Sequence, residues 1–162
     1  MFERERVGTL PVTLAELKSW NYIQDDIYND KLNVCLRSAI AAVESHINSV
    51  VWKSTFALSF DHMEYIIPVE IAPVESIVIT VDGEALQDSL YRFDGDVIAI
   101  DRSVEGSLMA VSIVAGKDAI DDDIKSAVLL MASELFRNPT DSVKQLPTAS
   151  QLLLQPHRRA NI

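Results

Sequence analysis

Residues 32–47 read LNVCLRSAIAAVESHI, and this stretch decides how the helical part of the chain folds. Its apolar residues recur at spacings of three and four, which is the spacing along one face of an α-helix. We therefore predict a long helix over residues 26–49 with one buried face. The members of that face are Leu32, Cys35, Leu36, Ala39, Ile40, Val43 and Ile47.

One further helix is predicted before this stretch and one after it. Thr13 and Glu16 have the spacing of a capping box, which predicts a short helix over residues 13–20. The acidic run Asp121–Asp123 suits the positive end of a helix dipole, and a second apolar stripe follows it. These features predict a third helix, which ends at Asn138-Pro139.

Between the helices, residues 51–116 have the pattern of β-structure. Val, Ile, Thr, Phe and Tyr are frequent there, and turn dipeptides recur at short intervals. Asp82-Gly83 and Asp94-Gly95 are typical of tight hairpin turns. We predict an antiparallel layer of about five or six strands, in which residues 55–60 pair with residues 63–67.

Composition and charge exclude several classes of protein. The chain has 162 residues with 24 acidic and 14 basic side chains, and its net charge of −10 disfavours general binding to a phosphate backbone. The single cysteine, Cys35, excludes a disulfide framework. No apolar run reaches the roughly 18 residues of a membrane span, and the first six residues carry mixed charge. We expect neither a signal peptide nor contact with a membrane.

Catalytic motifs are missing from the sequence. It contains no GxSxG, HExxH, P-loop or GxGxxG pattern, and its three histidines lie far apart. We therefore predict that the protein is not an enzyme and has no catalytic residues, no metal site and no cofactor.

Three features are not explained by a monomer. Val34 lies on the polar side of the long helix, and Leu129, Leu130 and Phe136 lie off the main stripe of the third helix. The stretch from Leu152 to Arg159 is apolar and then basic, so we interpret it as an arm that packs on another protein. Together these features favour self-association with a docked tail.

Acidic side chains are concentrated in the middle of the chain. Residues 51–116 hold eleven acidic and three basic side chains, a net charge of −8. Such a charge is typical of a solvated surface that keeps a protein soluble, and it also suits a surface that repels a polyanion.

A series of short segments follows one order along nearly the whole chain: Leu14–Lys18, Asp25-Asp26, Ala39–Glu44, Ile66–Pro68, Ala72–Ile77, Val114–Gly116, Ile124–Ala132, Phe136–Asn138 and Leu152–Arg158. The closing leucines, followed by Pro156, His157 and Arg158, are the most telling of them. This order resembles the head–tail connector (adaptor) proteins of long-tailed bacteriophages and prophages.

The resemblance implies a structural virion protein that forms a ring, usually of about twelve copies, at the head–tail interface. Such a ring attaches to the portal protein and offers its other face to a stopper or tail-completion protein. The genome passes through it toward the tail during ejection, without specific DNA binding. The resemblance also implies assembly in the host cytoplasm and a final place in the neck of the virion.

The expected fold is α+β. It is a helical bundle (two N-terminal helices and one C-terminal helix) with an antiparallel β layer inserted between them and an extended C-terminal arm. As one connector domain over residues 1–162, it divides into a helical part (12–50 and 118–138), a β-rich insertion (51–116) and a docking arm (139–162).

Three sets of residues take candidate roles in such a ring. The portal-docking arm carries Leu152, Leu153, Leu154, Pro156, His157, Arg158 and Arg159. Contacts between subunits are expected at Val34, Leu129, Leu130 and Phe136. We hypothesise that acids of the β layer line the lumen, where they repel DNA: Glu64, Glu70, Glu84, Asp88, Asp94, Asp96 and Asp101.

Other functions remain open at this point. A tail-completion or stopper protein of the same neck shares small α+β folds and ring assembly. A small acidic ligand-binding module would need a cleft with convergent polar groups in the β layer. An acidic enzyme would need two carboxylates with strongly shifted pKa values in one cleft, and the spacing of the acids does not support that.

Overall fold

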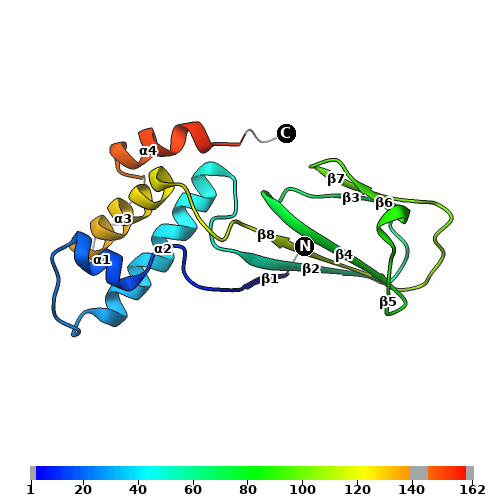
Figure 1. Ribbon diagram of the computed structural model, residues 1–162, viewed down its shortest axis with the longest axis horizontal. Coiled ribbons are helices and arrows are strands. Elements are labelled where there is room, and N and C mark those ends of the chain that lie inside the picture. Colours follow the sequence, from blue (N-terminus) through cyan, green and yellow to red (C-terminus); the bar gives the residue numbers. More distant parts are fainter. Residues whose placement is uncertain (1–2, 139–145, 160–162) are drawn as a thin grey trace. The chain divides into compact units, whose positions relative to one another are not determined.

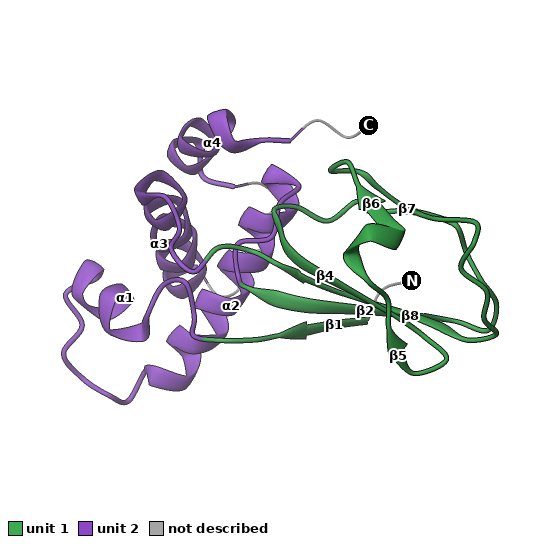
Figure 2. Ribbon diagram, turned by 45° about the vertical axis from the view of Figure 1, so that its right-hand side comes forward, with its two compact units in different colours: residues 1–8, 53–117 green, residues 9–52, 118–162 purple. Residues whose placement is uncertain are grey.

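The computed structural model describes residues 3–138 and 146–159 and confirms the predicted α+β class. The chain divides into two compact units (Figure 2). The β unit comprises residues 1–8 and 53–117, and the helical unit comprises residues 9–52 and 118–162. The helical unit is therefore built from two separate stretches of sequence, with most of the β unit inserted between them.

The helical unit contains four α-helices and one 3₁₀ turn in its described residues (Figure 1). Its two longer helices, α2 and α3, pack against each other, and α3 also packs against α4. The elements are α1 (Leu14–Trp20), α2 (Asn29–Ile47), α3 (Asp122–Arg137), α4 (Thr148–Leu154) and η2 (Gln155–His157).

The predicted capping box is present at the start of α1. The Glu16 backbone N–H donates to Thr13 Oγ1 over 3.2 Å, and the Thr13 backbone N–H donates to Glu16 Oε2 over 2.8 Å. These bonds satisfy donors that have no partner within the helix. The helix spans Leu14–Trp20, close to the predicted residues 13–20, and Asn21 is its C-cap.

The long helix α2 begins three residues later than predicted, at Asn29. Asp26 lies before the helix, and its carboxylate accepts from Lys18 Nζ at 2.6 Å and from Asn29 Nδ2 at 3.1 Å. At the other end, Asn48 takes the left-handed conformation that often ends a helix, with φ of 52°. The predicted buried face is confirmed, since all seven of its members are buried.

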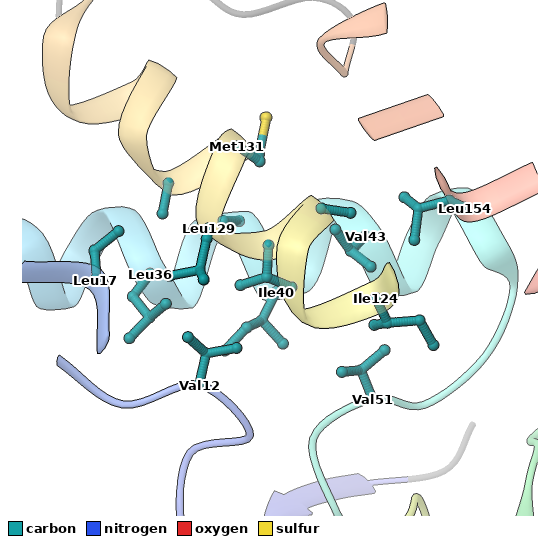
Figure 3. Close-up of a cluster of buried hydrophobic side chains, with 14 of the residues drawn as sticks. Val12, Leu17, Leu36, Ile40, Val43, Val51, Ile124, Leu129, Met131 and Leu154 are labelled. Carbon is teal, nitrogen blue, oxygen red and sulfur yellow. The ribbon is translucent and has the colours of Figure 1, made fainter. Parts of the chain in front are cut away.

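The core of the helical unit is one cluster of buried side chains between α1, α2, α3 and α4 (Figure 3). Leu17, Leu36, Ile40 and Leu154 are fully buried within it. Burial of such a side chain contributes about 1.5–3 kcal/mol to stability. The cluster therefore dominates the stability of this unit.

The β unit holds two antiparallel sheets rather than the single layer predicted. The larger has the order β1-β2-β8-β4-β5, with β1 (Glu3–Arg6), β2 (Ser54–Phe60), β8 (Met109–Ala115), β4 (Val74–Val81) and β5 (Glu84–Ala85). The smaller has the order β3-β7-β6, with β3 (Ile66–Pro68), β7 (Val97–Ile100) and β6 (Tyr91–Phe93). A 3₁₀ turn, η1 (Asp88–Leu90), precedes β6.

Two of the predicted turns are confirmed, and one predicted strand pair is wrong. Asp82-Gly83 joins β4 to β5, and Asp94-Gly95 joins β6 to β7. Residues 55–60 do not pair with residues 63–67, because the edges of β2 are occupied by β1 and β8. The three-residue strand β3 pairs with β7 of the smaller sheet instead.

The C-terminal stretch is not an extended arm, contrary to the sequence-based prediction. Residues 148–154 form α4, which places Leu154 in the core and leaves Leu152 66% exposed. Leu152 and Leu154 are two positions apart, which corresponds to a rotation of about 200° around the helix axis. One leucine is therefore buried while the other faces outward. The remaining parts of the predicted arm, residues 139–145 and 160–162, lie outside the described residues.

Among residues 3–138 and 146–159, no helix combines the length and the apolar character that crossing a membrane requires.

Candidate functional site

The C-terminal segment, which we define as residues 148–159, is attached to the helical unit of its own chain. Ser150 Oγ is buried and donates to the carbonyl oxygen of Ala127 over 3.3 Å. At the other end of the segment, the Arg159 backbone N–H donates to the Ile47 carbonyl oxygen over 2.9 Å, and Asn48 Nδ2 donates to the Arg159 carbonyl oxygen over 3.0 Å. The segment thus spans from α3 to the end of α2.

The seven residues of the predicted docking arm are divided by this attachment. Leu154 is fully buried, and Leu153 packs in part against the same core. Leu152, Pro156 and Arg158 are exposed. A partner that meets the folded segment therefore contacts a mixed surface, in which Leu152 and Pro156 lie among exposed polar residues that include Gln155 and Arg158.

His157 lies beside the acidic start of α3. Its Nδ1 is 3.6 Å from Asp121 Oδ2, and its Nε2 is 3.6 Å from Asp123 Oδ2. Nε2 is buried and has no hydrogen-bond partner within the described part of the chain. The basic end of the C-terminal segment therefore faces a run of carboxylates.

The four predicted subunit-contact residues have different environments. Val34 is 64% exposed, and Leu130 and Phe136 are half-buried. Leu129 is not available to a second subunit, because it is 5% exposed and belongs to the core of its own chain. The prediction failed here because α4 of the same chain covers α3, so its second apolar side needs no partner subunit.

One end of the helical unit exposes apolar side chains that the sequence analysis missed. Trp20, Tyr22 and Ile27 are 45%, 94% and 82% exposed, and Tyr28 is 45% exposed. The Tyr28 ring meets the Phe136 ring edge-on at 5.7 Å between centroids. The sequence does carry a signal for this exposed surface, because aromatic residues occur in the connection between α1 and α2, outside any apolar stripe.

A hydrogen bond and a cation–π contact hold this end together. Asn21 Nδ2 donates to Ser133 Oγ over 2.8 Å, which joins the end of α1 to α3. Lys31 Nζ lies 4.5 Å from the centroid of the Phe136 ring. The connection between α1 and α2 is therefore placed beside the end of α3, next to the predicted contact residue Phe136.

The seven candidate lumen-facing acids all belong to the β unit, but several of them also shape turns. Asp94 Oδ1 accepts from the backbone N–H groups of Asp96 and Val97, and these bonds hold the pKa of Asp94 below its usual value. The Ser103 backbone N–H likewise lowers the pKa of Asp101. Both carboxylates therefore have local structural partners.

The other five acids differ in their surroundings. Asp88 Oδ1 accepts from the Tyr91 hydroxyl over 3.0 Å, and Glu64 Oε2 lies 3.6 Å from His62 Nε2. The remaining three are exposed: Glu70, Glu84 and Asp96.

Titratable groups do not gather into a metal site within the described ranges. No group of three or more His, Cys, Asp or Glu side chains there is placed to hold a metal ion. Cys35 is buried in α2, and this burial raises the pKa of its thiol.

Three solved structures share this fold over nearly the whole chain. A chain from the neck of an empty gene transfer agent particle, computed with C6 symmetry, is 17% identical with a TM-score of 0.73, and the match covers 99% of this chain and 97% of that one. A chain from the neck of the native particle, computed with C12 symmetry, is 19% identical with a TM-score of 0.70 and the same coverage.

The third structure is the virion of the native gene transfer agent particle. Its chain is 17% identical with a TM-score of 0.72, and the match covers 98% of this chain and 96% of that one. No protein-family model matches the sequence, and no curated protein matches it.

Proposed function

We propose that this chain is a structural subunit of the neck of a bacteriophage or a related particle, in the position of the adaptor. The supporting observation is a fold shared with chains of a particle neck over 99% of this chain and 97% of the neck chain. A match of this extent includes both units and the C-terminal segment. It is more informative than a shared small motif, because each unit has a counterpart in the neck chain.

The proposed assembly is a ring of about twelve copies, as the C12 symmetry of one similar neck structure suggests. A cyclic ring needs two different contact faces on each subunit. Val34, Leu130 and Phe136 remain candidates for one of them, and Tyr28 joins them through its contact with Phe136.

A charge placed at Val34 tests this contact face. Val34→Glu should reduce ring formation, because the valine side chain is 64% exposed in the subunit and a carboxylate is costly in an apolar interface. Ring formation is measured by mass photometry and negative-stain microscopy. Val78→Glu is the matched control, at a valine that is 51% exposed in β4. Equal ring formation by the wild type and Val34→Glu would remove this face from the proposal.

Portal attachment is proposed for the exposed side of the C-terminal segment: Leu152, Pro156 and Arg158. Leu152→Asp should lower binding to the portal protein of the same particle by at least about tenfold, since it places a charge in an apolar contact. The substitution leaves the core intact because Leu152 is 66% exposed. Leu108→Asp is the control, at a leucine that is 60% exposed in the β unit. Undiminished portal binding by Leu152→Asp would contradict this role.

Passage of DNA without binding is proposed to rely on the acidic β unit. Replacing Glu70, Glu84 and Asp88 by lysine changes the net charge by +6, which should make assembled rings retain DNA at low salt. The control variant has Asp25, Asp30 and Asp118 replaced by lysine. Its net charge also changes by +6, but all three positions lie outside the β unit. Equal DNA retention by the two variants would argue against a lumen lined by the β unit.

Imaging of intact particles tests the proposed function as a whole. Cryo-electron microscopy with mass spectrometry of purified particles should find about twelve copies in a ring next to the portal. A ring found farther along the neck would assign the chain to the stopper or tail-completion proteins instead. Particles without the chain would overturn the proposal.

A further inference from the structure

We propose that the C-terminal segment is a strap that detaches from the helical unit while the rest of that unit stays folded. Its helix α4 is short and buries fewer residues than α2 or α3. The inference goes beyond the proposed function, because it concerns the isolated chain and does not depend on a particle.

The apolar part of the attachment is small. Within residues 148–159 only Ser150 and Leu154 are buried, whereas α2 buries eight residues. A helix of seven residues is not stable alone in water, and the first residue before α4, Pro147, provides no side-chain cap. The helical state of α4 therefore depends on its docking, and mainly on Leu154.

The polar part of the attachment places the His157 ring beside two carboxylates. His157 lies within 3.6 Å of Asp121 and of Asp123, and Arg158 and Arg159 follow it in sequence. The carboxylates belong to the start of α3, and the basic residues belong to the segment. Such partly exposed contacts between side chains are weak. This contact can therefore be weakened without disturbing the apolar core.

The last described residues of the segment are joined to α2 through hydrogen bonds. Arg159 exchanges two bonds with the end of α2, at Ile47 and Asn48. Both lie at the left-handed Asn48, where α2 already ends. Water can replace these partners when the segment leaves, so their loss does not unwind α2.

Detachment would change what the chain offers to a partner. In the docked state Leu154 is buried, and only Leu152 among the three leucines is well exposed. After detachment all three leucines and both arginines become accessible together.

Thiol labelling of the full chain with Ser150→Cys tests the strap directly. Position 150 is buried while the segment is docked, and the native Cys35 in α2 reports opening of the core in the same molecule. After correction for intrinsic thiol reactivity, we expect the introduced thiol to be labelled at least about tenfold faster than Cys35. Equal rates at all salt concentrations would overturn the proposal, because the segment would then open only with the core.

Charge variants of the Ser150→Cys chain identify the contact that controls opening. Asp121→Asn with Asp123→Asn should speed labelling at position 150 several-fold and leave Cys35 unchanged, since asparagine still suits the start of a helix. Asp122→Asn is the matched control, because it removes a charge from the same turn at a residue other than the two that lie beside His157. An equal acceleration by the control would refute the specific contact.

Hydrogen exchange on the unsubstituted chain gives an independent measurement. The amides of α4 should exchange at least about tenfold faster than those in the middle of α3. Equal protection of the two helices would contradict a separately opening strap. This result is independent of whether the chain is found in a virion neck.

Discussion

The helical unit and the β unit are stabilised in different ways. In the helical unit, side chains from distant parts of the sequence meet in one buried cluster. In the β unit, Ile79, Ile98 and Ile113 are also buried, and turn carboxylates in addition bind backbone N–H groups. The comparison teaches that lost volume is the main hazard of a substitution in the helical unit, whereas the β unit is sensitive to changes of backbone conformation at its turns as well.

The largest expected effect is the loss of a core leucine from the helical unit. Leu36→Ala should lower the free energy of unfolding by about 3 kcal/mol, because Leu36 is fully buried and its removal leaves a cavity. Urea denaturation followed by circular dichroism measures the change. Val34→Ala on the same helix should cost less than about 0.5 kcal/mol. Similar losses for both variants would contradict a core that depends on volume.

A smaller loss is expected at Gly116, where the backbone of the β unit limits the side chain. Its φ is +109°, and a Cβ there would lie 2.7 Å from Lys53 Cα. Gly116→Ala should therefore lower the free energy of unfolding by about 2–3 kcal/mol, measured by urea denaturation. Gly95→Ala is the matched control, with a φ of +107° but no atom within 4 Å, and should cost about 1 kcal/mol. Equal costs would show that the close approach to Lys53 does not matter.

Asp82→Ala should lower the free energy of unfolding by about 1–2 kcal/mol, because the Asp82 carboxylate stabilises a turn of the β unit. Its oxygens accept from the backbone N–H groups of Ser107 and Leu108, at distances of 2.8 to 3.1 Å. Asp82→Ala removes these bonds at a residue with a φ of 50°, which alanine tolerates poorly. Asp82→Asn keeps an acceptor and should retain most of the stability. If the alanine variant were as stable as wild type, the turn would not depend on this side chain.

The smallest expected effect is a dependence on pH within the helical unit. The hydrogen bond from Lys125, together with the Thr13 backbone N–H, lowers the pKa of Glu16 from 4.5 to about 2. Because the folded-state pKa is the lower one, this stabilisation is present above pH 4.5 and is lost as the pH falls toward 2. The loss is modest because water screens the partly exposed pair.

Thermal unfolding between about pH 2 and pH 6 measures this effect. Glu16→Gln should lose less stability than wild type over the acidic part of that range, and the two should differ most above pH 4.5. Parallel pH profiles for the two chains would show that the ion pair contributes nothing.

Local signals explain which elements could be predicted from the sequence. The capping box at Thr13, the apolar stripe of α2 and the Asp-Gly turns each involve residues close together in the chain. The sequence does not reveal strand partners in the same way, because β2 pairs with β8, which lies far along the chain. The short strand β1 was missed because its sequence, ERER, has no apolar alternation.

Surfaces were harder to predict than elements, and the C-terminal segment shows why. Its three leucines were interpreted as one apolar contact, but helical geometry separates Leu154 in the core from Leu152 on the surface. Leu129 was assigned to a second subunit because the presence of α4 was not foreseen. An error in one short helix therefore changed the interpretation of two separate surfaces.

The alternating charges of β1 restrict how two copies of this chain can meet. β1 is an edge strand, with Glu3 and Glu5 on one face of the sheet and Arg4 and Arg6 on the other. If the β1 edges of two molecules joined antiparallel, directly opposite residues would share a face, so glutamate would meet glutamate and arginine would meet arginine. Electrostatic repulsion therefore opposes the edge-to-edge pairing by which exposed strands seed aggregates.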